Sequence, residues 1–225
     1  MDTTKVYVEA GKKKVFVGAM DWPGWCRSGK SEAAALQALV DYGPRYGRVL
    51  QGTGIKLELP TSLSDLEVVE RLQGNATTDY GAPGGISAED RELYDVVSFK
   101  RDFNVLEACW RAFDQAVKQA AGRELRKGPR GGGMDLEKLV THLLGSDQAY
   151  LSKVAWKFKL EEGIDTSEGL RLTREATREA LDKAVNEGLP EKGPRGGETW
   201  PARYFVRRTA WHVLDHAWEI EDRIE

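Results

Sequence analysis

Cysteine and histidine are scarce in this chain, and long apolar runs are missing. Its 225 residues include two cysteines and three histidines. Cys26 and Cys109 are far apart and neither belongs to a CxxC motif, which argues against a disulfide framework and fits a reducing compartment. No apolar run approaches the roughly 18 residues of a membrane span, and residues 1–5 lack the apolar region of a signal peptide. We therefore expect a cytoplasmic protein that does not contact a membrane.

An excess of charge of one sign is also missing. The 33 basic and 36 acidic side chains give a formal net charge of -3, so the whole chain offers no field that would attract a polyanion. Basic and aromatic residues are not interleaved as in nucleic-acid-binding segments, and no nucleic-acid partner is expected. A hydrophobic fraction of 40% and a charged fraction of 31% are typical of a soluble globular protein.

The N-terminal third predicts a small α/β module. Turn-forming residues separate short β-rich runs, and one alanine-rich stretch favours a helix capped by Ser28 or Ser31. The elements expected in residues 1–73 are a hairpin over 5–19, a Pro-Gly turn at 21–25, a helix over 31–41, and β-like runs at 57–59 and 66–71. Their order is β-β-α-β(-β).

This module resembles the N-terminal part of HicB-type antitoxins. The resemblance rests on residues 15–25, a strand that leads into an Asp-Trp-Pro-Gly turn, and on residues 28–36, a Ser-Gly-Lys-Ser-Glu-Ala helix start. HicB proteins use the module against a ribonuclease toxin, so the resemblance implies a protein partner for the N-terminal module. The DNA-binding segment that such antitoxins usually carry has no counterpart in this chain.

Residues 74–86 are rich in Gly, Pro and small polar residues, which indicates a linker. From residue 87 onwards the apolar residues repeat at intervals of three and four, as on amphipathic helices. Four helices are expected. The first starts at a capping box at 87–90 and ends at Gly122 or at Gly128-Pro129, the second covers 135–163, the third is capped by Thr166 or Ser167 and ends at Gly188, and the fourth covers 199–225. We therefore predict an α+β two-domain chain, in which the β-β-α-β(-β) module precedes an all-α four-helix bundle over residues 87–225.

One hexapeptide, Lys-Gly-Pro-Arg-Gly-Gly, occurs at 127–132 and again at 192–197, each time before a helix that carries histidine. In an up-down bundle these two loops would lie at the same end. The simplest interpretation is helix termination followed by a flexible turn. The alternative is that Arg130 and Arg195, with backbone amides at the helix starts, bind an anionic substrate over the mouth of the bundle.

All three histidines lie in the predicted bundle. His212 and His216 are four residues apart, so one helix face can bring both imidazoles to one point, as in a two-ligand metal clamp. In an up-down bundle the helix of His142 runs parallel to theirs, with His142 about 10 Å and His212 about 16 Å from the helix starts. A lone histidine on an apolar face is more often a core residue, but three in one bundle favour metal.

The same residues resemble the DinB superfamily of four-helix bundles. The resemblance rests on residues 139–148 around His142 and residues 209–223 around His212 and His216, and it spans about residues 88–225. By this resemblance His142, His212 and His216 would bind a divalent metal, usually zinc or nickel. Related bundles include thiol-dependent transferases and isomerases.

The chemistry of such a centre is open to several interpretations. Three neutral imidazoles leave the charge of a divalent ion uncompensated and one position free for water or substrate. Val213 follows His212 where a zincin protease has glutamate, so HExxH chemistry is excluded. Glu219 is the candidate general base, and Asp215 and Asp147 are candidates for orienting an imidazole, although each is also a common solvated carboxylate.

Two functions from different classes follow. The preferred one is a metal-dependent enzyme, a hydrolase or thiol transferase, that activates water or a thiolate for a small-molecule substrate. The alternative is a binding or sensor protein without catalysis, in which the HicB-like module engages a protein partner. A homodimer is one assembly considered for either.

Overall fold

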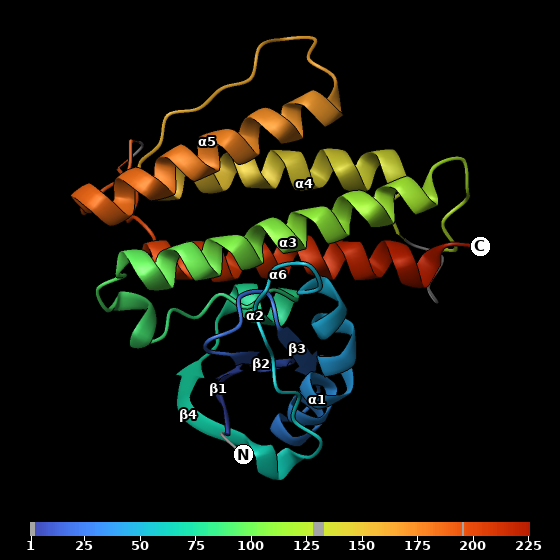
Figure 1. Ribbon diagram of the computed structural model, residues 1–225, viewed down its shortest axis with the longest axis vertical. Coiled ribbons are helices and arrows are strands. Elements are labelled where there is room, and N and C mark those ends of the chain that lie inside the picture. Colours follow the sequence, from blue (N-terminus) through green and yellow to red (C-terminus); the bar gives the residue numbers. More distant parts are fainter. Residues whose placement is uncertain (1–2, 128–132, 195) are drawn as a thin grey trace.

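The computed structural model describes residues 3–127, 133–194 and 196–225. A four-stranded mixed sheet near the N-terminus is followed by helices, which confirms the α+β class. Figure 1 shows helices α3 to α6 stacked above the sheet, with α6 next to it. No helix in the described part of the chain is both long and apolar enough to cross a membrane.

The sheet is built from four strands in the order β3-β2-β1-β4. β1 and β2 form the predicted antiparallel hairpin, β3 extends it antiparallel to β2, and β4 lies parallel to β1. The predicted run at 66–71 is confirmed as β4. β3 was not predicted, because its four residues carry little periodicity of their own. The strands are β1 (Thr4–Ala10), β2 (Val15–Ala19), β3 (Cys26–Gly29) and β4 (Leu66–Gln73).

The β-like run at 57–59 is not a strand, so this prediction was wrong. These residues lie beside helix α1 (Glu32–Val49), where the Leu59 side chain approaches Gly43 closely. The apolar side chain of Leu59 therefore packs on a helix instead of pairing as a strand. Ser31 caps α1 as one of the two predicted candidates, accepting a hydrogen bond from the Ala34 amide.

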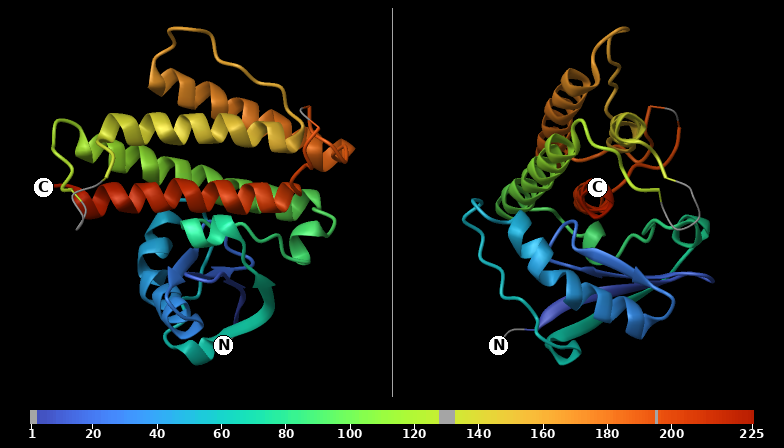
Figure 2. Two further views of the ribbon diagram at one scale, coloured as in Figure 1. Left: turned by 180° about the vertical axis from the view of Figure 1, so that it is seen from behind. Right: turned by 90° about the vertical axis from the view of Figure 1, so that its right-hand side faces the viewer.

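The sheet is covered on both faces. Val6 and Val8 alternate with Tyr7 along β1, and they belong to the core that contains Leu39 of α1. Tyr7 belongs to a second buried cluster, with Phe16, Cys26 and Trp211 of α6 (Ala202–Arg223). α1 therefore packs on one face of the sheet and α6 on the other. Figure 2 shows the sheet from the side, with α6 end-on above it.

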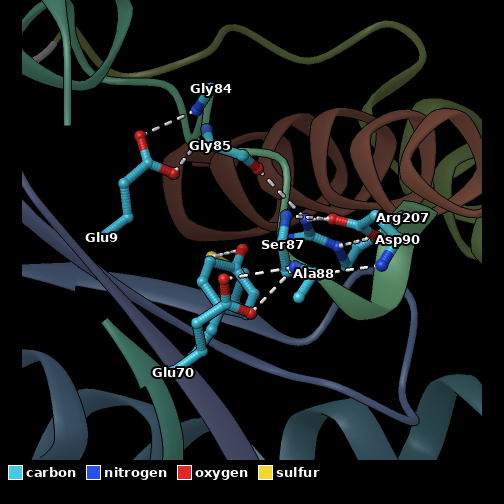
Figure 3. Close-up of polar contacts among 10 residues, drawn as sticks. Glu9, Glu70, Gly84, Gly85, Ser87, Ala88, Asp90 and Arg207 are labelled. Atoms are coloured by element: carbon cyan, nitrogen blue, oxygen red, sulfur yellow. Dashed lines mark hydrogen bonds and ion pairs between the residues drawn. The ribbon is translucent and has the colours of Figure 1, made fainter. Parts of the chain in front are cut away.

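Residues 74–90 are tied to the sheet by buried polar contacts. The carboxylate of Glu9 on β1 accepts hydrogen bonds from the Gly84 amide at 2.9 Å and the Gly85 amide at 2.8 Å, as Figure 3 shows. It also accepts one from the Thr78 hydroxyl, in the short helix α2 (Ala76–Tyr80). The stretch predicted as a linker therefore contains a helix and packs against the sheet.

The same stretch ends in an ion pair with α6. The guanidinium of Arg207 donates from Nε to Asp90 at 3.1 Å and from Nη2 to Asp90 at 2.5 Å, and it lies 4.3 Å over the Tyr7 ring (Figure 3). Ser87 and Asp90 make the reciprocal contacts of the predicted capping box. Only a 3-10 turn over Glu89–Arg91 follows Ser87, and the long helix starts later, after Asp95. The prediction of a helix start at residue 87 was therefore wrong.

The later helices are α3 (Val96–Ala120), α4 (Leu136–Leu151), α5 (Thr166–Glu187) and α6. The helix predicted to reach residue 163 ends about one 3-10 turn after Leu151, because Ala155 takes the left-handed conformation at φ 58°. Residues 155–165 then run along the core, with half-buried side chains of Trp156 and Phe158 packed against it.

Residues 155–165 form a crossover that brings the chain back to the other end of the helices, so that α5 runs parallel to α4. The start of α4 lies at the end of α6, where Arg223 donates to the Met134 carbonyl, and the end of α4 lies at the start of α6, where the Tyr150 and Phe205 rings are 6.5 Å apart. Figure 1 shows that α4 and α5 run in one direction and α3 and α6 in the other. The prediction of parallel α4 and α6 was therefore wrong, since a simple up-down order has no crossover between neighbours.

As a first testable prediction, replacement of Asp90 by alanine should strongly destabilise the fold. Arg207 is 7% exposed, so its guanidinium would stay buried without its partner. Breaking a buried pair on one side costs about 3–5 kcal/mol. The measurement is the free energy of urea unfolding.

The matched control is Glu168→Ala, which removes an exposed pair with Arg171 on α5. We expect it to cost less than about 1 kcal/mol. Equal losses for the two variants would contradict a structural role for the Arg207–Asp90 pair.

Candidate metal centre

The three histidines come together where α4 and α6 cross. His142 lies near the middle of α4, and His212 and His216 lie one turn apart on α6. The antiparallel crossing puts the middle of each helix against the other. His212 is 7% exposed, His216 is half-buried and His142 is exposed. The group therefore has a buried side and a side that faces solvent.

The distances within the group fit a bound ion. One nitrogen from each ring can be chosen so that all three lie within 4.8 Å of one another, and the Nε2 atoms of His212 and His216 are 3.2 Å apart. Two nitrogens that bind one zinc ion tetrahedrally at about 2.0–2.1 Å lie about 3.3 Å apart. The pair on α6 meets this requirement as it stands, and the exposed ring of His142 would approach by at most about 1.5 Å. The three side chains could hold a metal ion.

A chain of polar contacts orients His216. Its Nδ1 lies 3.0 Å from Oε2 of Glu219, one turn later, and Oε1 of Glu219 accepts from Arg223. Arg223 is itself held by the carbonyls of Arg126 and Met134. An Nδ1–H that donates to Glu219 leaves the lone pair of His216 on Nε2, directed at His212. Glu219 therefore favours the tautomer that a metal ligand needs.

Burial favours the neutral form of His212 and His142, because it lowers the pKa of both imidazoles. It lowers the pKa of His212 well below the ordinary value, and the charges of His216, Arg208 and His142 lower it further. Burial also lowers the pKa of His142, with a further contribution from His216. The hydrogen bond from His216 is the main cause of the lowered pKa of Glu219. Neutral imidazoles beside an ionised carboxylate are the protonation states that a divalent ion requires.

Glu219, predicted as a general base, lies against the outer nitrogen of His216 in the described part of the chain. That position suits an orienting residue, and its role as a base stays a prediction. Asp215, predicted to orient an imidazole, instead forms an ion pair with Arg27 of β3 at 3.3 Å. Asp147, the other candidate, is buried, and its Oδ1 has no hydrogen-bond partner among the described residues.

The two predicted substrate-binding residues, Arg130 and Arg195, lie outside the described residues. The described residues that flank these two loops lie at opposite ends of α4. Lys127 precedes α4, near Arg223 at the end of α6, whereas Gly193 lies close to the Ser152 carbonyl at the end of α4. The expectation that the two loops are neighbours was wrong, because the crossover makes α4 antiparallel to α6.

Sequence reasoning missed Arg208, which lies one turn before His212 on the same face of α6. Its guanidinium lies 5.6 Å from the centre of the Tyr150 ring, and the His212 ring lies 5.9 Å from the same centre. The signal was present as a spacing of four in the series Arg208, His212 and His216. On its solvent side the group borders a surface cavity of about 440 Å³, lined in part by Lys138, Thr141 and His142.

Comparison with known proteins returned no match: no family model, no curated protein and no solved structure is significantly similar to the chain.

The contact between His216 and Glu219 generates a second prediction. Glu219→Gln should weaken zinc binding about 10–100-fold, as for other residues that orient a metal ligand. The measurement is competition for zinc against a chromophoric chelator. Glu221→Gln is the control, because Glu221 lies on the same helix but pairs with Arg45. Equal zinc affinity in the two variants would contradict the orienting role.

The buried carboxyl of Asp147 generates a third prediction. Burial raises its pKa to about 7, although the charge of Arg174 opposes the rise. Since the unfolded value is about 3.9, the folded state holds the proton between about pH 4 and 7, and the wild type loses stability as the pH rises through that window. Asp147→Asn has no such proton to lose. Its stability relative to the wild type should therefore increase from pH 5 to pH 7 and level off above.

The measurement is urea unfolding of both proteins at several pH values. Asp182→Asn on α5 is the control, because the Asp182 side chain is exposed. A stability difference between Asp147→Asn and the wild type that does not change with pH would contradict a neutral carboxyl in the core.

Proposed function

We propose that the chain is a metal-binding protein of DinB type, in which α3 to α6 form the four-helix bundle and His142, His212 and His216 hold a divalent ion, zinc or nickel. The observation that carries the proposal is the convergence of all three histidines of the chain, from two helices, within 4.8 Å. The orienting contact of Glu219 and the neutral state of the buried imidazole support it.

We further propose that the centre is catalytic, as a hydrolase or thiol transferase for a small molecule. A divalent ion held only by neutral imidazoles keeps its charge and lowers the pKa of a water or thiol that binds it. The residues of the chain position the ion. His212 would bind it from the buried side of the centre, His142 lies on the solvent side, and Glu219 holds the His216 ring in place. The solvent side is where a substrate would enter.

A second function, metal-dependent binding or sensing without catalysis, is favoured by one contact. Trp211, next to His212, packs edge-on against Phe16 of the sheet with ring centres 6.0 Å apart. A movement of the His212 side chain on metal binding would therefore shift the neighbouring Trp211 and alter its contact with the sheet. In this alternative the HicB-like module engages a protein partner in response to the metal. The cytoplasmic location and the homodimer stay predictions.

A fourth prediction tests the metal itself. Protein purified without chelator or nickel resin should carry about one divalent ion per chain, or take one up from added zinc or nickel, because three imidazoles are available. Elemental analysis after gel filtration is the measurement. His216→Ala and His142→Ala should each lose the ion while circular dichroism stays unchanged. A wild type that neither carries nor takes up metal would overturn the proposal.

A further inference from the structure

Two adjacent arginines on α6 are buried to a similar degree but differ in their partners. Arg207 is 7% exposed and Arg208 is 9% exposed. Arg207 is bound by the carboxylate of Asp90 through two nitrogens and by the Gly85 carbonyl. Among the described residues, Arg208 has no carboxylate at ion-pair distance, and its Nη1 is buried without a hydrogen-bond partner. A buried guanidinium that lacks an anion is costly, so it indicates a missing ligand.

The surroundings of Arg208 hold its guanidinium in place without neutralising it. The guanidinium lies 4.6 Å from the centre of the Trp211 ring and 5.6 Å from the centre of the Tyr150 ring. Such cation–π contacts stabilise a cation but do not occupy its N–H donors. Arg208 is therefore held near two aromatic rings, while its Nη1 has no hydrogen-bond partner among the described residues.

The position of Arg208 relates it to the histidines. Arg208, His212 and His216 follow one another at intervals of four on α6, so they form a row in which each residue lies about 6 Å further along the helix axis than the one before. The ring of Tyr150 contacts both the guanidinium and the His212 imidazole. A molecule of a few bonds in length could reach from the imidazoles to the guanidinium.

We infer that Arg208 binds the carboxylate of a small organic acid whose other end reaches the three-histidine centre. The inference rests on the proposed function, since the second contact needs the metal. A guanidinium matches a carboxylate through two parallel N–H donors, which makes this anion the natural partner. Arg208 is then the residue that selects charged substrates over neutral ones.

The experiment compares two hydroxamates with the same metal-binding group. Cobalt(II) replaces zinc, and binding is followed by the visible spectrum of the cobalt. One probe is the monohydroxamate of succinic acid, which carries a carboxylate. The other is its amide, which has the same length but no charge. We expect the wild type to prefer the carboxylate by about tenfold or more, as for a charge-assisted hydrogen bond.

Variants assign the preference to its residue. In Arg208→Gln the two hydroxamates should bind equally, with the affinity of the amide probe unchanged, and Arg208→Lys should restore part of the preference. Arg203→Gln is the matched control, because Arg203 lies on α6 but over the Tyr94 ring, away from the histidines. It should keep the full preference. Gel filtration after titration checks that the probes have not removed the cobalt.

The outcomes separate the two proposals. Failure to bind cobalt would overturn the proposed function and this inference together. Three results would overturn the inference alone, provided that cobalt binds. They are the absence of a preference for the carboxylate probe, the failure of both probes to bind, and a preference that persists in Arg208→Gln. Urea unfolding of the metal-free variants gives a second readout. Arg208→Gln should be as stable as the wild type, whereas a loss as large as that of Arg207→Gln would mark Arg208 as structural.

Discussion

The buried ion pair between Arg207 and Asp90 is the contact on which the arrangement of sheet and helices depends. Asp90 belongs to a stretch that Glu9 holds to the sheet through the Gly84 and Gly85 amides, and Arg207 belongs to α6. The pair thus joins the last helix to the first strand across most of the chain. Breaking one side of such a pair leaves a charge in a place where water cannot reach it. This requirement helps to fix the position of α6 beside the sheet, together with its apolar contacts.

Because α6 is held on one side by the sheet, its other side is available for the histidines. Successive residues of a helix point about 100° apart, so Trp211 faces the sheet cluster while His212 faces α4. The ion pair of Arg207 and the row from Arg208 to His216 are therefore two faces of one rigid element. The catalytic and the sensing proposals both use this element. They differ in whether it only positions the imidazoles or also transmits their state to the sheet.

Residue patterns over a few positions correctly predicted the features that depend on interactions between nearby residues. The hairpin, the Ser31 cap, the helix over residues 166–188 and the close approach of the His212 and His216 rings all depend on residues a few positions apart, and all are present. Errors arose where distant residues decide. The contacts of the capping box between Ser87 and Asp90 are present, but Asp90 also pairs with Arg207, and the long helix begins only after Asp95.

The direction of α4 relative to α6 is also decided by distant residues, and it was predicted wrongly. The histidines nevertheless come together, and the helix directions explain why. With parallel helices, the predicted starts leave His142 about 6 Å short of His212 along the common axis. With antiparallel helices, the start of each helix lies at the end of the other, so His142 and His212, each near the middle of its helix, come close together. The left-handed Ala155 and the crossover that follows decide between the two directions, and neither has a periodic signal. The same crossing brings the Tyr150 ring near both His212 and Arg208, so the surroundings of the Arg208 guanidinium, which has no ion-pair partner among the described residues, depend on a topology that residue spacing alone does not encode.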